Sequence, residues 1–244
     1  MNPGASGLAR GLRVLEVLAG EEAAAAGGLG VVRVAELVSA EKSQASRTLT
    51  ALAERGFVER DPVTQTYRLG WQAFALAAQA GEPRLLVAAP VVLRRLVAEL
   101  GESAHLSVRH GASVTTVLSE SPPSALHAPG RVGVPTPVRT TATGRALVVD
   151  LSPGELEDLG LGDIAERVAA IRAEGHAAVV DEFEPGLAAV AAPVRDFSGS
   201  VVAAVNVSGP TFRLSPRLDK AATSVRAAAA ELSGALGFSG RSVA

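Results

Sequence analysis

The sequence predicts an α+β protein with an amino-terminal winged helix-turn-helix and a separate carboxy-terminal α/β domain. Three observations lead to this prediction. Helical apolar spacing recurs before a two-strand pattern within the first 70 residues, strand and helix patterns alternate afterwards, and 48% of the 244 residues are hydrophobic. That hydrophobic fraction is ample for buried cores and excludes a chain that is disordered throughout.

Composition restricts the functions that the chain can have. There are no cysteines, which excludes disulfides, a thiol nucleophile and cysteine-ligated zinc or iron–sulfur sites. The amino terminus lacks the apolar core of a signal peptide, and no apolar run reaches the roughly 18 residues of a membrane span. We therefore expect a cytoplasmic protein without membrane contact.

Charge gives no bulk signal for nucleic acid. The formal net charge is −2, and residues 1–80 hold eight basic and eight acidic side chains. A nucleic-acid-binding domain is usually basic. Any contact with DNA must therefore come from a local basic face.

The amino-terminal elements follow from the spacing of apolar residues. Leu8, Leu12, Leu15 and Leu18 recur at helical spacing, and Gly56 stands where a glycine ends a helix. In order, we expect a helix over Gly7–Leu18, a loose connection over Glu21–Gly30, helices over Val31–Val38 and Lys42–Arg55, and strands over Phe57–Arg60 and Thr66–Leu69.

An alanine-rich linker helix precedes the second domain. Pro90 could set the start of the next helix, because proline suits a first helical turn. We expect a winged domain over residues 1–70, a linker helix over 71–81 and an α/β domain over 82–244. The expected helices are Gly70–Ala80, Leu85–Leu100, Thr141–Leu151, Pro153–Leu159, Asp163–Glu174 and Arg217–Leu236; the expected strands are Ser103–Arg109, Ser113–Glu120, Ala188–Val194 and Ser200–Val207, with a five-proline loop over Ser121–Pro137.

The third helix carries the first functional pattern. Once Ala45, Leu49 and Leu52 face the core, polar side chains remain outside or at the edge. These are Lys42, Ser43, Gln44, Ser46 and Arg47. Such hydrogen-bonding types suit base edges and phosphates, although an ordinary solvated helix face would show the same pattern.

Two ordered blocks of motifs resemble the IclR family of bacterial transcriptional regulators. The first block comprises Arg10–Leu15, Val34–Leu37, Lys42–Leu49, Glu54–Asp61 and Tyr67–Gly70, and the second comprises Asp181–Gly186, Ala191–Asp196 and Val205–Pro210. The resemblance spans about residues 8–237. It implies contact with a double-stranded DNA operator, a GAF-like effector-binding domain, and assembly as a homodimer or homotetramer. It also adds Arg10, Thr48 and Arg68 to the expected DNA contacts.

The resemblance further implies a pocket for a small-molecule effector. Its expected lining is Leu126, Ala128, Thr136, Ala142, Thr143, Val179, Leu187, Ala189, Asn206 and Ser208. Asn206 and Ser208 alternate on one strand and so share a face, which could instead be a solvent-facing edge. Some relatives place an acid at position 179 and a cysteine at position 189, so we expect a less polar pocket here. Ser39 also replaces the glycine usual in the helix-turn-helix turn.

Other chemistries have weaker signals. The four histidines, His105, His110, His127 and His176, lack metal-motif spacing and are expected at the surface or in packing. No Gly-x-Ser-x-Gly elbow is present, and the acids of Asp181–Glu184 are expected in a charged turn rather than as paired catalytic carboxylates. The leading interpretation is a repressor controlled by a small molecule, with no enzymatic activity, metal or cofactor. The alternative is a small-molecule-binding enzyme with an accessory winged helix.

Overall fold

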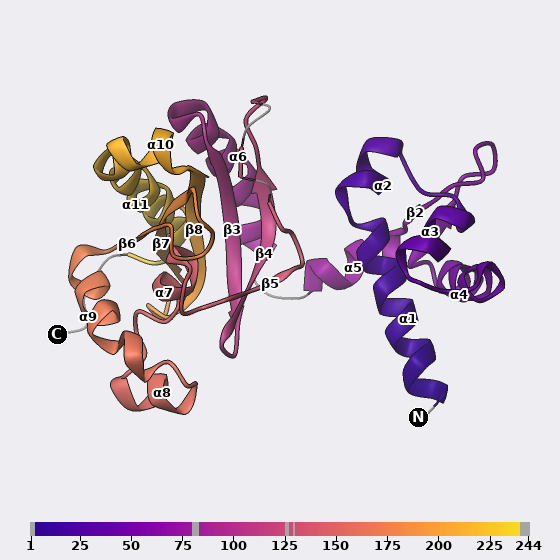
Figure 1. Cartoon of the computed structure of the whole chain (residues 1–244), viewed down its shortest axis with the longest axis horizontal. Coiled ribbons are helices and arrows are strands. Elements are labelled where there is room, and N and C mark those ends of the chain that lie inside the picture. Colours follow the sequence, from indigo (N-terminus) through magenta and orange to yellow (C-terminus); the bar gives the residue numbers. More distant parts are fainter. Residues whose placement is uncertain (1–2, 80–82, 125–126, 129, 240–244) are drawn as a thin grey trace. The chain divides into compact units, whose positions relative to one another are not determined.

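The computed structural model describes residues 3–79, 83–124, 127–128 and 130–239. The chain divides into two compact units, Met1–Pro83 and Arg84–Ala244 (Figure 1). The first unit is mainly helical and ends in a small two-stranded sheet, whereas the second contains a six-stranded sheet with helices on both faces. These two units confirm the predicted fold class.

Helices dominate the amino-terminal unit. They are α1 (Pro3–Leu18), α2 (Glu21–Ala26), α3 (Val31–Leu37), α4 (Lys42–Glu54) and α5 (Trp71–Gln79), with strands β1 (Val58–Arg60) and β2 (Tyr67–Leu69) between the last two helices. Buried Val14, Val34 and Leu49 bring α1, α3 and α4 into one core. The loose connection predicted over Glu21–Gly30 is wrong for its first part. Its consecutive alanines favour helix, and α2 continues until Gly27 adopts a left-handed conformation with φ 68°.

The turn between α3 and α4 contains a strained residue. Ser39 has a φ of 51°, in the left-handed region that glycine enters without steric cost. The sequence departure at this position therefore has a physical consequence. The backbone keeps the conformation of the turn, although a residue with a Cβ is sterically strained there.

Replacing Ser39 with glycine is expected to raise the free energy of unfolding of the amino-terminal unit by about 0.5–1 kcal/mol. The gain from relieving the left-handed serine is partly offset by the greater backbone freedom of glycine in the unfolded chain. Urea unfolding of the full chain followed by circular dichroism measures it. A Ser39→Gly variant that unfolds earlier than the parent would contradict this explanation of the turn.

The β1–β2 hairpin forms the wing. The strands pair antiparallel from Val58 opposite Leu69 to Arg60 opposite Tyr67. Asp61 organises the connecting turn, because its Oδ1 accepts hydrogen bonds at 2.8 Å from the backbone N–H groups of both Val63 and Thr64. These backbone hydrogen bonds, with that of Thr64 the largest, lower the pKa of Asp61 and keep it ionised. The turn thus has a fixed shape.

An antiparallel sheet of order β5-β4-β3-β8-β7-β6 organises the carboxy-terminal unit. Its strands are β3 (Ser103–His110), β4 (Ser113–Glu120), β5 (Pro135–Pro137), β6 (Ala177–Val180), β7 (Leu187–Arg195) and β8 (Val201–Pro210). Its helices are α6 (Pro83–Leu100), α7 (Ala142–Leu147), α8 (Pro153–Asp158), α9 (Ala165–Glu174), α10 (Thr211–Leu214) and α11 (Leu218–Ala235), with 3-10 turns η1 (Gly162–Ile164) and η2 (Ser215–Arg217). The short elements β5, β6 and α10 are additions to the predicted set.

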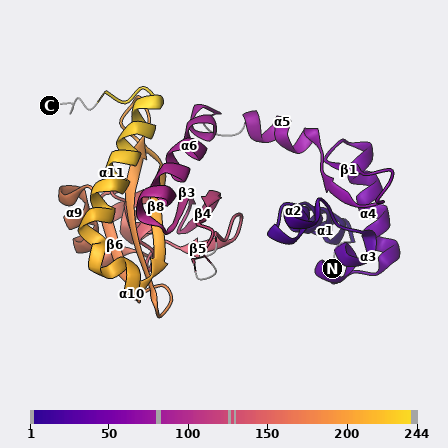
Figure 2. The ribbon, with the colours of Figure 1, turned by 90° about the horizontal axis from the view of Figure 1, so that it is seen from above.

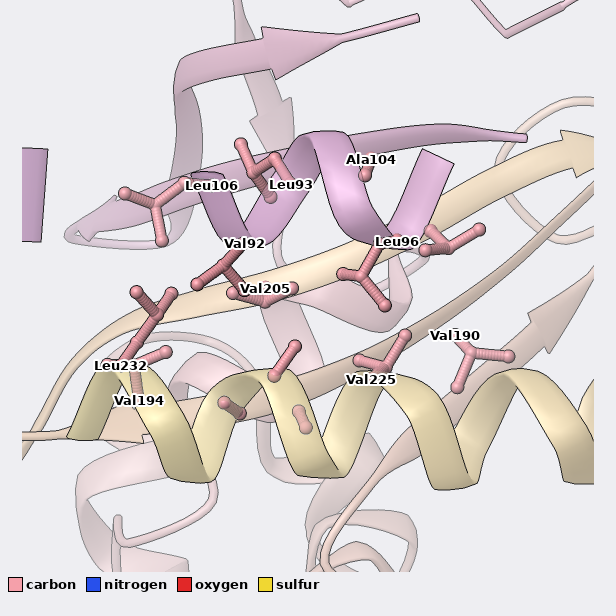
Figure 3. Close-up of a cluster of buried hydrophobic side chains, with 14 of the residues drawn as sticks. Val92, Leu93, Leu96, Ala104, Leu106, Val190, Val194, Val205, Val225 and Leu232 are labelled. Atoms are coloured by element: carbon pink, nitrogen blue, oxygen red, sulfur yellow. The ribbon is translucent and has the colours of Figure 1, made fainter. Parts of the chain in front are cut away.

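The two faces of the sheet have different partners. Helices α6 and α11 lie side by side along one face (Figure 2). Alternate strand residues, such as Val190 and Val205, belong there to one apolar cluster with Leu96 of α6 and Val225 of α11 (Figure 3). Helices α7, α8 and α9 cover part of the other face through a second apolar cluster. Successive strand residues therefore contribute to different cores.

Pro90 does not start a helix. It lies inside α6, which begins at Pro83. A proline in a helix interior removes one backbone hydrogen bond, but the apolar face that includes Leu85, Ala89 and Leu93 continues across it into the core. Burial of that continuous face outweighs the local preference of the proline. No helix in the described ranges is both long and apolar enough to cross a membrane.

Candidate nucleic-acid interface and ligand cavity

Helix α4 presents a polar face to solvent. Ala45 and Leu49 are fully buried beneath it. Six predicted DNA contacts lie on this helix: Lys42, Ser43, Ser46 and Arg47 are exposed, and Gln44 and Thr48 are half-buried. The Thr48 hydroxyl donates to the carbonyl oxygen of Gln44 at 3.0 Å, so its proton is already engaged in a hydrogen bond within the helix.

The other two predicted contacts lie on different elements. Arg68 stands on β2 of the wing, where its Nη2 forms an exposed ion pair at 3.1 Å with Glu59 of β1. Arg10 is half-buried on α1. Within the described ranges, Arg47 has no ion-pair partner. Like Lys42, which is also exposed and outside the ion pairs, it is free to contact a phosphate or base.

A cavity of about 470 Å³ opens on the sheet face opposite α6 and α11. Its wall includes alternate residues of β3, β4, β7 and β8 together with the start of α7. Nine of the ten residues expected in the pocket line this cavity: Ala128, Thr136, Ala142, Thr143, Val179, Leu187, Ala189, Asn206 and Ser208. The tenth, Leu126, lies outside the described residues.

The cavity is mainly apolar, with a few buried polar groups. Val179 and Ala189, the two apolar positions at which some relatives have an acid and a cysteine, are buried in its wall. Asn206, Ser208 and Thr143 are the buried polar members of the predicted set. An apolar wall with a small number of placed polar groups is the usual composition of a small-molecule site.

Sequence reasoning missed one central residue of the wall. His105, expected at the surface or in packing, is 5% exposed on β3 and lines the cavity. Burial lowers its pKa to about 4, because removal from water disfavours the charged imidazole. The signal lay in β3 itself, where His105 alternates with Ala104 and Leu106, whose side chains enter the opposite core.

The rim of the cavity carries paired charges. Arg131 Nη2 lies 3.2 Å from Glu184 Oε2, and the Arg131 guanidinium stands over the ring of Phe183 at 5.6 Å from its centroid. All three residues line the cavity. The rim therefore contains one positive and one negative side chain that face each other.

The acidic residues after β6 fix the loop of residues 181–186, which we call the rim loop, at the edge of the cavity. Buried Arg145 of α7 donates from Nη1 to Glu182 Oε1 at 2.9 Å, and hydrogen bonding from Arg145 lowers the pKa of Glu182. Asp181 Oδ1 accepts from the backbone N–H of Gly186 at 2.7 Å and from the Thr211 hydroxyl at 3.1 Å. These carboxylates are thus occupied in loop structure, in agreement with the expected charged turn. In the described part of the chain, no three His, Asp or Glu side chains are placed to hold a metal ion.

A winged helix-turn-helix with a polar recognition helix, joined in one chain to a unit with a ligand-sized cavity, defines a ligand-responsive DNA-binding regulator. The comparisons with known proteins agree. The model of the IclR helix-turn-helix domain matches residues 7–62, and that of the bacterial transcriptional regulator IclR C-terminal domain matches residues 81–234. The chain belongs to the IclR family of transcriptional regulators. This membership confirms the predicted family and gives no support to the enzyme alternative.

Individual relatives match over nearly the whole chain. The HTH-type transcriptional regulator BhcR of Paracoccus denitrificans is 31% identical, over 94% of this chain and 87% of the relative. The HTH-type transcriptional repressor AllR of Klebsiella pneumoniae is 28% identical, over 96% and 91%. The crystal structure of an IclR transcriptional regulator from Alicyclobacillus acidocaldarius has a TM-score of 0.72 at 23% identity and covers 95% of this chain and 99% of its own. This last likeness supports the fold.

Proposed function

We propose that the protein is a transcriptional repressor whose affinity for operator DNA is controlled by a small, uncharged effector. Residues 1–70 would bind the operator, 71–81 would link, and 82–244 would bind the effector. The repressor sign is supported by the relative named a repressor. We place its action in the cytoplasm, where the operator DNA of a bacterium lies.

The proposed DNA contacts centre on α4. A helix of this kind enters the major groove with its amino-terminal residues toward base edges. Lys42, Ser43 and Arg47 are exposed on that part of α4, and Gln44 and Ser46 adjoin them. Thr48, Arg10 and Arg68 complete the proposed set, with Arg68 on the wing. Selection of genomic fragments by the purified protein at a stated salt concentration tests DNA binding directly.

We propose a homodimer or a dimer of dimers. Reading two half-sites requires two recognition helices about one helical turn of DNA apart, or a multiple of it. Leu8 and Leu12 of α1 are 69% and 53% exposed, and Leu76 of α5 is 54% exposed, which gives the amino-terminal unit apolar surface for self-association. We expect sedimentation at micromolar concentration to show a dimer or tetramer. Monomer alone, with and without DNA, would exclude this assembly.

The effector site is proposed to be the cavity, with Asn206 as its main polar anchor. Asn206 supplies donors and an acceptor and Ser208 a hydroxyl, while Val179, Leu187 and Ala189 provide apolar contact. The nine predicted lining residues come from six segments spread over positions 128–208, which the fold brings to one cavity. That convergence carries the proposal.

Replacing Asn206 with leucine is expected to leave operator affinity intact but to blunt the effect of the ligand on it. The substitution removes the amide without touching α4, and a ligand shifts the equilibrium only by its differential affinity for the two conformations. The effector is first identified as the metabolite that releases wild-type protein from its selected fragment. The same titration is then repeated with Asn206→Leu by fluorescence anisotropy.

A matched variant separates the two sites. Arg47→Ala should lose operator affinity yet bind the effector as the parent does. If Asn206→Leu releases DNA at the same effector concentration as wild type, the cavity is not the effector site.

A further inference from the structure

A continuous hydrogen-bonded chain runs from β4 through a buried histidine to the cavity. His105 Nδ1 lies 3.0 Å from Ser119 Oγ, and His105 Nε2 lies 3.1 Å from Ser208 Oγ. The strands β4, β3 and β8 that carry these residues are neighbours in the sheet. Ser208, at the inner end, lines the cavity. The imidazole therefore contacts the hydroxyl that a ligand would meet.

The backbone at Gly130 packs against the outer end of this hydrogen-bonded relay, where Ser119 is half-buried. A Cβ at Gly130 would lie 1.9 Å from Ser119 Oγ and 3.3 Å from His105 Nδ1. Only glycine, which has no Cβ, allows the polypeptide backbone to pass this close to Ser119 Oγ and His105 Nδ1. Because His105 is also buried and its pKa is about 4, the imidazole stays neutral near pH 7. A neutral imidazole has one donor nitrogen and one acceptor nitrogen.

The two tautomers of His105 give Ser208 opposite hydrogen-bonding characters. With the proton on Nδ1, His105 donates to Ser119 Oγ and accepts the Ser208 hydroxyl proton at Nε2, so Ser208 can only accept from a ligand. With the proton on Nε2, Ser119 donates to Nδ1 and His105 donates to Ser208 Oγ. The Ser208 hydroxyl is then free to donate into the cavity. Neither arrangement places a charge there.

Charges elsewhere on the wall do not favour an anion. Besides His105, the ionisable side chains among the described lining residues are His127, Arg131 and Glu184. Arg131 and Glu184 pair with each other, and His127 Nδ1 lies 2.6 Å from the carbonyl oxygen of Ser124. A ligand carboxylate would lose its hydration next to Glu184, and it would compete with that residue for Arg131.

We propose that His105 is a specificity-determining residue, which acts through Ser208 as a neutral relay and makes the cavity selective for uncharged ligands with a hydroxyl, carbonyl or amide group. This inference rests on the proposed ligand-binding role of the cavity. It adds that the tautomer of His105 sets whether the Ser208 hydroxyl donates a hydrogen bond to the ligand or accepts one from it. His105 also lines the cavity, but both of its ring nitrogens face serine hydroxyls, so the role that we propose for it is that of a positioning residue.

The first experiment measures ligand class. Benzyl alcohol, benzamide and benzoate share a ring that suits the apolar wall and differ in the polar group. Isothermal titration of the full-length protein at pH 7.5 should show binding of the two neutral probes, with benzoate at least about tenfold weaker, as expected for an uncompensated buried charge. Benzoate binding as tightly as benzamide, or no binding of either neutral probe, would overturn the proposal.

The second experiment tests the relay with a matched pair of variants. The amide of His105→Gln can reach the position of Nε2 and contact Ser208, whereas that of His105→Asn ends near Nδ1 and falls short. We expect His105→Gln to bind benzamide within about threefold of wild type and His105→Asn to lose about tenfold, the order of one buried hydrogen bond. A merely structural histidine would respond similarly to both substitutions.

A double-mutant comparison ties the effect to Ser208. In a Ser208→Ala background, His105→Asn should cause no further loss, because the relay has no hydroxyl to orient. Ser107→Ala is the control, because the Ser107 hydroxyl of β3 lies 3.2 Å from that of Thr116 of β4 and Ser107 also lines the cavity. In the Ser107→Ala background, the loss of affinity from His105→Asn should persist. Additive losses in the Ser208→Ala background would overturn the relay. Failure of the proposed function shows separately, as an Asn206→Leu protein that still releases DNA normally.

Discussion

Replacing Arg47 with alanine is expected to weaken operator binding by about 1–3 kcal/mol, which is roughly 5- to 150-fold in affinity. The reason is the position of Arg47 on the exposed face of α4, above the buried Ala45 and Leu49. From the position that we propose in the groove, an arginine would read a base or anchor a phosphate. Fluorescence anisotropy with the selected operator fragment measures the loss.

Salt dependence and a matched variant sharpen this test. If Arg47 contacts a phosphate, the slope of log affinity against log salt should fall in magnitude by about one unit, and if it reads a base, the loss should be largest on the specific site. Arg55→Ala removes the same charge from the exposed C-cap of the same helix and should change affinity little. Equal losses for the two variants would show that only net charge matters.

Replacing Glu102 with alanine is expected to lower the free energy of unfolding of the carboxy-terminal unit by about 2–3 kcal/mol. The Glu102 side chain is 1% exposed, and its two oxygens accept hydrogen bonds at 2.8 Å from Arg213. Breaking a buried pair is costly. The cost stays at the lower end because Arg213 and Arg217 are partly exposed and can be rehydrated.

Urea unfolding followed by circular dichroism measures the loss at Glu102. Glu231→Ala is the matched control, because Glu231 pairs with Arg95 at the surface of α11 and α6, where an ion pair contributes little. A Glu102→Ala variant no less stable than Glu231→Ala would show that the buried pair does not hold α10 to the start of β3.

The predicted lining of the cavity came from the family resemblance, and the alternation of strand residues added only that Asn206 and Ser208 share a face. Asn206 and Ser208 were expected on one face of a strand, and they lie there. His105 and Arg131 were not found, because their approach to this site depends on long-range pairing. The local alternation along β3 places His105 on the face opposite Ala104 and Leu106, but only the register that sets His105 opposite Asn206, about a hundred positions away, brings it to the cavity.

Errors in the fold prediction have a related cause. The strand β6 has only four residues, Ala177–Val180, with no long alternation to mark it; its pairing with β7 makes it a strand. Pro90 gave a strong local signal that tertiary burial of α6 overrode. In contrast, α4 was predicted nearly in full, since its apolar spacing is local and Gly56 marks its end.

The alternation of faces along β7 and β8 has a consequence for engineering. Val190 and Val205 belong to the core under α6 and α11, whereas Ala189 and Asn206 line the cavity. Cavity residues are therefore interleaved in sequence with those of the core under α6 and α11 but separate from that core in space, whereas Val179 and Ala189 also belong to the second apolar cluster. If the cavity is the effector site, as we propose, a library at position 206, with only apolar replacements at positions 179 and 189, would change which compound the protein senses and leave the core under α6 and α11 intact. Such separability makes this unit a practical starting point for a genetically encoded biosensor.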